Sequence, residues 1–221
     1  MADEFPPAIP AATVVLVRDG MQGLETLMLR RNAHGSFGGM WVFPGGRVDA
    51  ADGEDEAGAR RAAVRETLEE ASLVVDPAAL VPFAHWTPPP IAPKRFATWF
   101  FLASAPAGIV AVDGNEIHEH IWVTPDEAIR RRDAGEIELA PPTFVTLHWL
   151  SRSPDVASAL ADAASGPVEF FSTKVMRATT GEPIAVWHGD VAYEGDDLDV
   201  AGARHRLVMI DGAWAYERRD G

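Results

Sequence analysis

The sequence predicts a mixed α/β fold that continues into a β-rich stretch at the C-terminal end. Residues 12–17 form a short apolar run and residues 24–31 alternate apolar with polar side chains, and both patterns are typical of β-strands. Residues 54–71 are instead rich in alanine, arginine and glutamate, which favour helices. After Gly166 the predicted elements are all strands. Helices and strands therefore share the longer first part of the chain, and strands alone occupy the rest.

The predicted elements follow one another with recognisable boundaries. The first two strands are joined by the turn 18–23, so they should form an antiparallel hairpin. A glycine-rich loop follows, and a short strand at 40–46 ends in a Gly-Gly turn before the helix at 54–71. The alanines of that helix give it a small apolar face, which suits close packing on a sheet. The later elements are predicted as strands at 79–86, 95–105 and 119–124, helices at 124–132, 141–152 and 153–164, each opened by a proline near its start, and strands at 168–177, 182–189, 204–212 and 213–219.

Length and composition limit the classes of protein. With 221 residues, the chain fits one domain or one domain with an appendage. We place a domain over residues 1–166 and a β-rich extension over 167–221, either packed on the domain or continuous with it. The chain has no cysteine, so disulfides, thiolate metal sites and cysteine nucleophiles are excluded. The acidic, proline-rich N-terminus lacks the features of a secretory signal, and a cytoplasmic location is expected.

The formal charge of −14 restricts the partners. Binding to a nucleic acid polymer depends on lysine and arginine neutralising phosphates, so such a partner is not expected. A membrane partner is not expected either, because no apolar run approaches the ~18 to 20 residues that span a bilayer. An anionic small molecule would need local help from a few arginines or from a bound cation.

Three glutamates in the predicted helix are the main functional candidates. Glu66, Glu69 and Glu70 are separated by three and four residues, so they project from one face of the helix. One interpretation is a solvated acidic face, which is common on helices. The other is a site for a hard cation such as Mg²⁺, which prefers oxygen ligands and often binds together with substrate phosphates. The spacing alone leaves both interpretations open.

The surrounding residues resemble the Nudix box. That box is a glycine followed by a glutamate and then by R-E-U-x-E-E-x-G-U, where U is a bulky aliphatic residue. Here Gly46 follows a strand, and residues 65–73 read R-E-T-L-E-E-A-S-L. Two positions depart from the pattern: Thr67 replaces an aliphatic residue and Ser72 replaces the glycine. The linker is about five residues longer than in the common box, so Glu54 and Glu56 are both candidates for the upstream glutamate.

The resemblance extends over roughly residues 10–152. The segments "VFPGGRVDAAD", "HWTPPPIAPKRFATWFFLA" and "ELAPPTFVTLHWL" look like the branch of peroxisomal acyl-coenzyme A diphosphatases and their bacterial relatives. The glutamine-bearing signature L-x-x-H-x-G-Q of that branch is absent, and "NAHGSFGGMW" stands in its place. The resemblance implies a Nudix-type α/β/α sandwich with a mixed β-sheet. It also implies a hydrolase of a nucleoside diphosphate linked to another moiety, such as acyl-coenzyme A or a dinucleotide, and a homodimer.

The resemblance further implies roles for the acidic residues. Mg²⁺ or Mn²⁺ would be bound by Glu66, Glu69 and Glu70, and Glu69 would serve as ligand or as catalytic base. A further catalytic carboxylate is expected from the segment "NEIHEHIWV", which offers Glu116 and Glu119. Glu119 lies three residues before a tryptophan, an arrangement that many family members share. An ordinary charge at the edge of a strand is the alternative for Glu119.

The remaining candidates are basic residues and glycines. Arg65 is expected to brace the loop and the glutamates, which would make it important for catalysis without contacting the substrate. Arg95 and Arg31 are candidates for substrate binding, because an arginine can hold a phosphate with two parallel hydrogen bonds. Gly45 and Gly46 are expected in the substrate-binding turn. Simple surface polarity is the alternative for both arginines, and for His34 in the same loop as Arg31.

Other readings stay open at this point. A Nudix-fold nucleotide-binding or regulatory protein without turnover would keep the same fold, since fold alone does not fix function. An isomerase on this fold usually needs a cysteine or a further acid. A zinc site at His118 and His120 lacks a nearby third ligand in the sequence. Trp41, Trp86 or Trp99 could stack on a nucleobase, although packing in the core is the more common role.

Overall fold

The computed structural model describes residues 7–33, 37–92 and 94–220. Eight strands of these residues form the main β-sheet, in which β1 to β8 follow the order β3-β2-β1-β6-β5-β8, with β4 paired to β1 and β7 paired to β2. The pairs β1–β6 and β5–β8 are parallel, and the other pairs are antiparallel. The sheet is therefore mixed, as predicted. Its strands are β1 Ile9–Gly20, β2 Gly23–Arg31, β3 Trp41–Val42, β4 Gly45–Arg47, β5 Val81–Thr87, β6 Phe96–Ser104, β7 Ile117–Val123 and β8 Glu169–Ser172.

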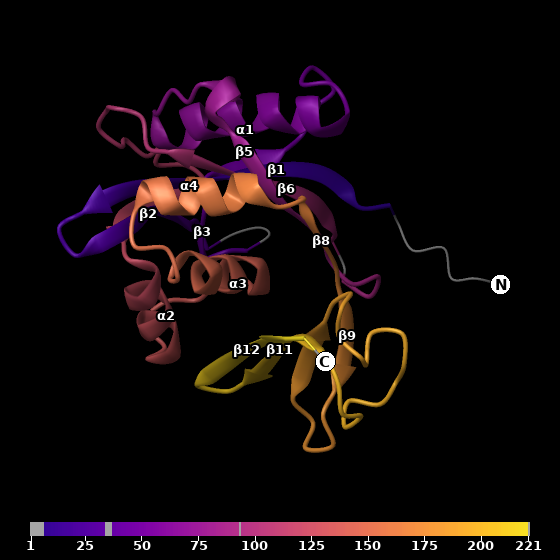
Figure 1. Cartoon of the computed structure of the whole chain (residues 1–221). Coiled ribbons are helices and arrows are strands. Elements are labelled where there is room, and N and C mark those ends of the chain that lie inside the picture. Colours follow the sequence, from indigo (N-terminus) through magenta and orange to yellow (C-terminus); the bar gives the residue numbers. More distant parts are fainter. Residues whose placement is uncertain (1–6, 34–36, 93, 221) are drawn as a thin grey trace.

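Helices cover both faces of this sheet (Figure 1). The helix α1 lies on one face, and its buried alanines pack with Val14, Leu16 and Leu27 of the sheet. The helices α3 and α4 lie on the opposite face, where Val15 and Val17 join a second apolar cluster. Residues 14–17 of β1 thus alternate between two buried faces, which explains why all four are apolar. The α/β/α sandwich is confirmed. Its helices are α1 Asp55–Ala71, α2 Pro125–Asp133, α3 Pro141–Leu150 and α4 Val156–Ser165, with a 3₁₀ turn η1 at Pro77–Ala79.

The helix starts follow local capping chemistry. Thr124 caps α2, since its hydroxyl accepts a hydrogen bond from the backbone N–H of Glu127 at 3.3 Å, and Pro125 fills the first helical position. The helix α4 begins later than its proline suggests, because Asp155 is its cap and accepts from the N–H of Ser158 at 2.7 Å. None of the helices within the described ranges is long and apolar enough to cross a membrane.

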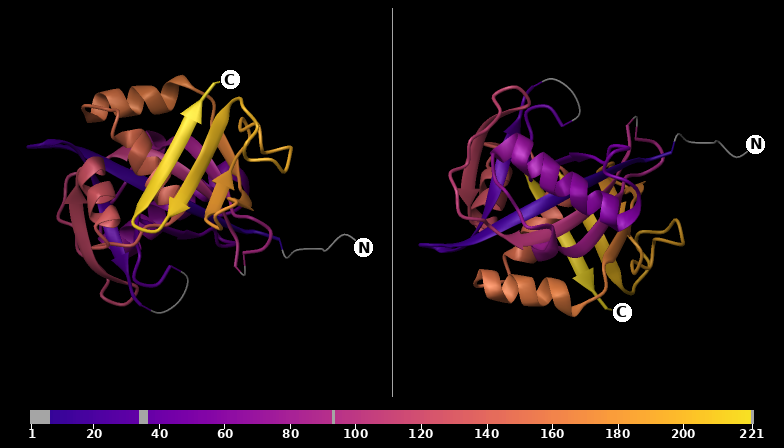
Figure 2. Two further views of the ribbon diagram at one scale, coloured as in Figure 1. Left: turned by 90° about the horizontal axis from the view of Figure 1, so that it is seen from below. Right: turned by 90° about the horizontal axis from the view of Figure 1, so that it is seen from above.

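The C-terminal part forms a second, antiparallel sheet in the order β12-β11-β10-β9 (Figure 2). The single strand predicted over 168–177 is wrong: its first half, β8, extends the main sheet beside β5, and its second half belongs to the second sheet. Thr173 separates the two halves, and its N–H donates to the carbonyl of Thr87. Trp187, which directly follows β10, and Leu207 of β11 are buried in the same apolar cluster as Leu147 of α3. The strands of this sheet are β9 Lys174–Arg177, β10 Pro183–Val186, β11 Arg204–Ile210 and β12 Ala213–Arg219.

Ser72 ends α1 in the left-handed backbone conformation, with φ 57° and ψ 29°. The glycine of the family pattern therefore has a physical reason, because a residue with a side chain is strained by about 1 kcal/mol in this conformation. Ser72 offsets part of that strain, since its hydroxyl donates to the carbonyl of Ala111 at 2.9 Å.

We expect Ser72→Gly to be more stable than Ser72→Ala by about 1 kcal/mol, because both variants lose the hydroxyl and only glycine relieves the backbone. Urea denaturation of the two variants measures the difference. Equal stabilities would show that the left-handed conformation costs nothing at this position.

Candidate active site

The second half of α1 places its glutamates beside the Gly45–Gly46 turn of β4. The N–H of Gly45 donates to Oε2 of Glu70 at 2.9 Å. A side chain on Gly46 would collide with the carboxyl group of Glu66, so the glycine leaves the space that this carboxylate occupies. Glu66 and Glu70 are therefore both held against the turn, whereas the side chain of Glu69 is 57% exposed. The structure therefore brings the Gly-Gly turn and two of the glutamates together.

Glu70 is buried, with only 4% of its surface exposed. Its Oε1 atom has no hydrogen-bond partner among the described residues, and the nearest cation is Nη1 of Arg31 at 3.6 Å. The other terminal nitrogen of Arg31 binds Oε2 of Glu116 at 2.7 Å. Arg31 thus links Glu116 to Glu70. Asp113 fixes the start of β7, where Glu116 lies, because its carboxylate accepts hydrogen bonds from the N–H groups of Glu116 and Ile117 at 2.9 Å.

The crowded carboxylates are electrostatically unusual. Burial raises the pKa of Glu70 to about 7, although the N–H of Gly45 and the charge of Arg31 lower it. Burial also raises the pKa of Glu66, with Arg65 acting in the opposite direction and the charges of Glu69 and Glu116 adding to the rise. Carboxylates that are costly to ionise in the protein alone are stabilised by a positive charge placed between them.

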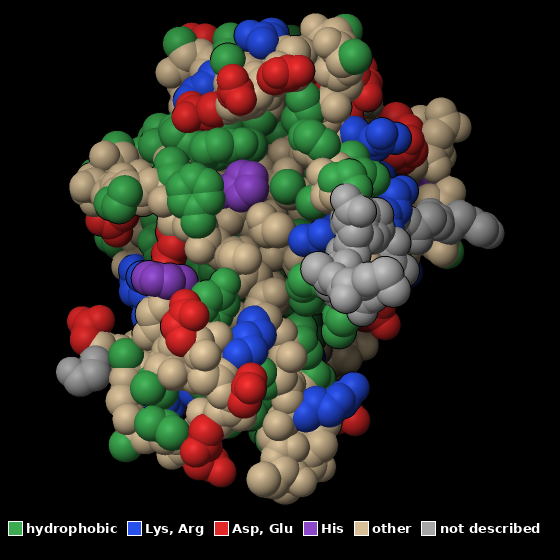
Figure 3. Space-filling view, turned by 90° about the vertical axis from the view of Figure 1, so that its right-hand side faces the viewer, with side chains coloured by type: hydrophobic (Ala, Val, Ile, Leu, Met, Phe, Trp, Pro, Cys, Tyr) green, Lys and Arg blue, Asp and Glu red, His purple; other side chains and the backbone are tan. Residues whose placement is uncertain are grey.

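Arg65 braces this arrangement, as expected from the sequence. Its guanidinium binds Oε1 of Glu66 at 2.7 Å and lies 3.3 Å from Oε2 of Glu69. On its other side it binds Oδ2 of Asp52 at 2.7 Å and donates to the carbonyl of Arg47 at 2.9 Å. Arg65 therefore ties the helix to the loop after β4. Acidic side chains gather on the outside of the molecule at the end that carries α1 (Figure 3).

Asp52 is a site residue that the sequence analysis missed. Its side chain is almost fully buried, and the hydrogen bond from Arg65 lowers its pKa while burial acts in the opposite direction. The linker has no periodicity that would separate Asp52 from the other acids around it, so sequence reasoning had no signal for it. Asp49 is nearby but 63% exposed, at 3.7 Å from the Arg65 guanidinium.

We expect Asp52→Asn to lower the free energy of unfolding by about 1–3 kcal/mol, because it removes the charged partner of a partly buried guanidinium. Asp49→Asn is the matched control, and its exposed position predicts a change within about 0.5 kcal/mol. Urea denaturation of both variants checks this. Equal losses in the two would mean that Arg65 gains its support from the general acidity of the loop.

Other predicted residues lie elsewhere. Glu119 binds Arg30 at 3.1 Å, and both side chains are about half exposed. Glu119 shares its face of β7 with Ile121, which packs toward the α3 and α4 side of the sheet, opposite α1. The structure therefore brings Glu116 to the glutamates and leaves Glu119 away from them. Glu56 binds Arg60 instead of the cluster.

Of the basic candidates within the described residues, Arg31 lies at the glutamates, whereas Arg95 and the histidines of β7 lie apart from them. Arg95 lies in the connection between β5 and β6, where its guanidinium donates to the carbonyl of Pro88 at 3.4 Å. His118 and His120 are exposed on β7. His34 falls outside the described residues. Among the residues that are described, no three histidine or carboxylate side chains form a ready-made metal cluster.

The carboxylates nevertheless fit a hard divalent cation. Arg65 occupies oxygen atoms of Glu66 and Glu69, while the buried Oε1 of Glu70 lacks a hydrogen bond from the described residues. All donors in the cluster are carboxylate oxygens, which are the ligands that Mg²⁺ and Mn²⁺ prefer. Glu66, Glu69 and Glu70 are therefore the residues available to hold such an ion.

Comparisons with known proteins agree with this geometry. The NUDIX domain model matches residues 7–144. The curated protein "Putative nudix hydrolase 7" of Caenorhabditis elegans is 29% identical over 170 residues, which cover 59% of this chain and 57% of that protein. The chain therefore spans little more than half the length of this relative.

Solved structures share the fold. A NUDIX hydrolase from Alicyclobacillus acidocaldarius superposes with a TM-score of 0.65 at 24% identity, covering 73% of this chain and 99% of that one. The NUDIX domain of Shewanella oneidensis NrtR, solved with ADP-ribose, has a TM-score of 0.51 at 16% identity, covering 67% and 89% of the two chains. Since the family match spans more than half of the sequence and includes the turn and helix that form the site, the chain belongs to the NUDIX domain family.

Proposed function

We propose that the protein hydrolyses the phosphate anhydride of a nucleoside diphosphate linked to another moiety, with Mg²⁺ or Mn²⁺ as cofactor. The observation that carries this proposal is the buried carboxylate cluster. Glu66 and Glu70 are held under the Gly45–Gly46 turn with raised pKa values, and Arg31 draws Glu116 toward them. Such a cluster costs stability unless a cation compensates it, and a cation site is what this reaction needs.

The chain supplies the parts of a hydrolytic site. When bound, a divalent cation would offset the charge of the diphosphate and make a coordinated water more acidic. Glu66 and Glu70 would hold the ion, and Arg65 keeps Glu66 in place from the side of the loop. Glu69 or Glu116 would take the proton from the attacking water. The new P–O bond forms to the water oxygen as the bridging P–O bond breaks, so the products are two phosphate monoesters.

Similarity to known proteins supports a more specific proposal for the substrate. The sequence segments shared with acyl-coenzyme A diphosphatases support an acyl-coenzyme A-like substrate, and a dinucleotide is the other candidate. The ADP-ribose bound by the NrtR domain, which shares the fold, is a molecule of the same diphosphate class. A homodimer and a cytoplasmic location remain predictions from the sequence.

A substrate panel tests the proposal and shows whether Glu116 or Glu119 takes part in catalysis. Acyl-coenzyme A, coenzyme A, ADP-ribose, NADH and diadenosine polyphosphates are incubated with Mg²⁺ or Mn²⁺, and product formation is followed by chromatography. We expect cation-dependent cleavage of at least one compound. Glu116→Gln should lower kcat about a hundredfold, because it removes a carboxylate next to the cluster. Glu119→Gln is the matched control on the same strand, and we expect its kcat to stay within about twofold of wild type.

A binding protein without turnover is the second candidate. Arg65 binds oxygens of both Glu66 and Glu69. If the guanidinium kept these contacts with nucleotide bound, the two carboxylates would be less available to a cation, and the binding function would be favoured. Absence of cleavage across the whole panel, together with retained nucleotide binding, would favour this function and reject the hydrolase.

A further inference from the structure

Arg31 contacts two carboxylates of the candidate active site in different ways. Its Nη2 atom binds Oε2 of Glu116 at 2.7 Å, whereas its Nη1 atom lies 3.6 Å from Oε1 of Glu70. The first contact is a hydrogen-bonded ion pair, and the second is too long for a hydrogen bond. Oε1 of Glu70 is buried and accepts no hydrogen bond from the described residues. Arg31 therefore compensates the charge of Glu70 without binding its oxygen directly.

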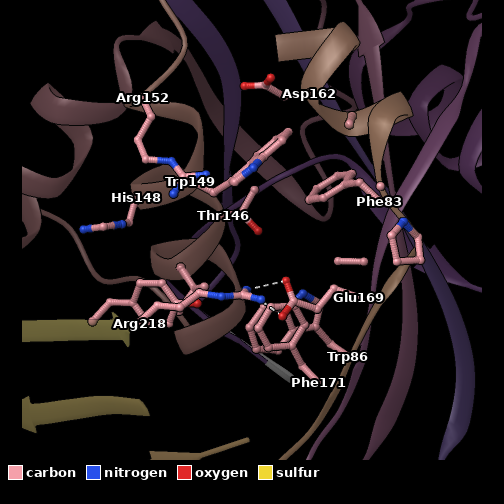
Figure 4. A pocket seen from close by; sticks show the side chains of 16 residues that line it. Phe83, Trp86, Thr146, His148, Trp149, Arg152, Asp162, Glu169, Phe171 and Arg218 are labelled. Carbon is pink, nitrogen blue, oxygen red and sulfur yellow. Dashed lines mark hydrogen bonds and ion pairs between the residues drawn. The ribbon is translucent and has the colours of Figure 1, made fainter. Parts of the chain in front are cut away.

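Another arginine–carboxylate pair of this chain shows what a saturated contact looks like. Nη1 of Arg218 lies 2.6 Å from each of the two oxygens of Glu169 (Figure 4). This pair borders a cavity of about 370 Å³ that α3 and α4 line together with β5, β8 and β12. The guanidinium of Arg31 is instead divided between two carboxylates and binds only Glu116 closely. Its contact with Glu70 is the weaker one, so it is the one that exchanges more readily.

The backbone of Arg31 is held on both sides, so a change at this residue involves its side chain alone. The N–H of Arg31 donates to the carbonyl of Met40 at 3.0 Å, and its carbonyl accepts from the N–H of Gly39 at 3.2 Å. On the other side, Arg31 pairs with Ile117 of β7. The side chain is 24% exposed, so solvent reaches part of it. The guanidinium can therefore turn about Glu116 while the strand stays in place.

The Arg31 guanidinium and a divalent cation compete for the charge of Glu70. An ion bound to Oε1 at the usual distance of about 2.1 Å would lie no more than about 6 Å from Nη1 of Arg31. Positive charges at this separation repel each other in a partly buried site, where the effective dielectric constant is well below that of water. Arg31 therefore lowers the affinity of the glutamates for a cation, and it moves away from Glu70 when a cation binds there.

We propose that Arg31 is an exchangeable counter-ion, which pairs with Glu70 in the cation-free protein and with a phosphate of the substrate in the cation-bound protein. The inference rests on the proposed function, because the phosphate is that of a diphosphate substrate. A guanidinium that leaves Glu70 stays beside the site through Glu116. Phosphate oxygens accept two parallel hydrogen bonds from such a group. Binding of the cation and binding of the phosphate would thus favour each other.

Titration of the full chain with Mg²⁺ tests the competition for Glu70. Calorimetry at pH 8.5, above the pKa of about 7 of Glu70, gives the affinity without any turnover. We expect Arg31→Gln to bind Mg²⁺ about tenfold more tightly than wild type, because no guanidinium competes. Arg31→Lys keeps the charge and should stay within about threefold of wild type. Arg30→Gln is the matched control, since Arg30 is the neighbouring residue of β2 and pairs with Glu119 on the other face.

The phosphate contact is tested with methylenediphosphonate, a diphosphate analogue whose bridging CH₂ group resists hydrolysis. The analogue is titrated into each protein in saturating Mg²⁺. We expect its affinity to fall about tenfold in Arg31→Gln and about fivefold in Arg31→Lys, because an ammonium group cannot form the two parallel hydrogen bonds. Arg31→Gln should thus change the two affinities in opposite directions, which a purely structural role of Arg31 would not produce.

The outcomes separate this exchange from the proposed hydrolase activity. Tighter Mg²⁺ binding and weaker diphosphonate binding in Arg31→Gln, with neither change in Arg30→Gln, support the exchange even if the substrate panel shows no turnover. Unchanged or weaker Mg²⁺ binding in Arg31→Gln overturns it even if the panel shows turnover. Should Arg31→Gln not fold, Arg31→Lys decides. Weaker diphosphonate binding at an unchanged Mg²⁺ affinity supports the exchange, and an unchanged diphosphonate affinity overturns it.

Discussion

Glu70→Gln is expected to lower kcat about a thousandfold while making the cation-free protein more stable. The loss of activity follows from removing the charge of a carboxylate that is proposed to hold the cation. The gain in stability follows from burial, since the carboxylate has a pKa raised to about 7 and one oxygen without a hydrogen bond from the described residues. A neutral amide of the same shape avoids this cost, and we expect about 2 kcal/mol at pH 8 in EDTA.

The pH dependence of this effect has a defined sign. The pKa of Glu70 is about 7 in the folded protein and near the ordinary glutamate value of 4.5 in the unfolded chain. Between these values the folded state binds more protons, so the free energy of unfolding falls as the pH rises. The stabilisation from the protonated carboxyl is complete below pH 4.5 and is lost as the pH passes about 7. Glu70→Gln should remove this part of the pH dependence.

Denaturation with urea from pH 5 to pH 8 in EDTA measures this change, and the hydrolysis panel measures kcat. Glu56→Gln is the matched control, because Glu56 belongs to the same helix but forms a half-buried ion pair with Arg60 instead of joining the glutamate cluster. It should change neither kcat nor the pH dependence. A Glu70→Gln variant that retains activity would reject the proposed cation site, and one with an unchanged pH dependence would reject the raised pKa.

The sequence was most informative where chemistry depends on local spacing. Glu66 and Glu70 lie on one face of α1 because a helix has a fixed period, and that period is visible in the residues. The small apolar face of the same helix follows from the run of alanines, which is found buried on the sheet. The left-handed end of α1 at Ser72 was also foreseeable, since the family pattern has glycine at that position.

The sequence was least informative where chemistry depends on contacts between distant strands. Glu116 directly precedes β7 and Glu119 lies within it. The periodicity of the sequence alone could not decide which of the two approaches the glutamates of α1. Arg30 and Arg31 point to opposite faces of the sheet, as successive strand residues do. An irregularity in the pairing of β2 with β7 places Glu119 opposite Arg30 but Ile117 opposite Arg31, so Glu119 binds Arg30 and Glu116 binds Arg31. Asp52 was missed for a similar reason, because its role arises from a contact thirteen residues away.

The sequence also could not predict how the chain passes from the main sheet to the C-terminal sheet. Strand propensity predicted β over 168–177, but the change of sheet at Thr173 depends on which strand edges are free. The cavity lined by β5, α3, α4, β8 and β12 has no sequence signature either, because its walls come from five separate elements. Its existence depends on how the second sheet packs, and the buried ion pair within that sheet is therefore worth testing.

Asp190→Ala is expected to destabilise the whole protein by about 3–5 kcal/mol, because it leaves a buried arginine without its partner. The carboxylate of Asp190 binds two nitrogens of Arg206 at 2.7 and 2.6 Å, and both side chains are buried. It also accepts from the backbone N–H groups of Ala192 and His205 at 2.9 Å. Asp196→Ala is the matched control, since Asp196 is 99% exposed beside Lys174 and should cost less than about 1 kcal/mol.

The pH dependence distinguishes the two acids further. Burial alone would raise the pKa of Asp190, but Arg206 and the two backbone donors outweigh it and hold the pKa at about 2. The folded state therefore binds fewer protons than the unfolded chain as the pH falls below 3.8, the ordinary pKa of an aspartate. This stabilisation is present above pH 3.8 and is lost toward pH 2. Asp190→Ala should lack this component of acid unfolding, whereas Asp196→Ala should keep it.

The form of the unfolding transition decides what the C-terminal stretch is. Trp187 and Leu207 share one buried cluster with Phe144 and Leu147 of the domain, so the second sheet and the domain should unfold together. We therefore expect a single transition that shifts as a whole in Asp190→Ala, observed both by tryptophan fluorescence and by circular dichroism of the helices. Two separate transitions, of which only one shifts, would instead establish residues 167–221 as an independent unit. The buried contacts of Trp187 and Leu207 with Phe144 and Leu147 would then join two units that associate.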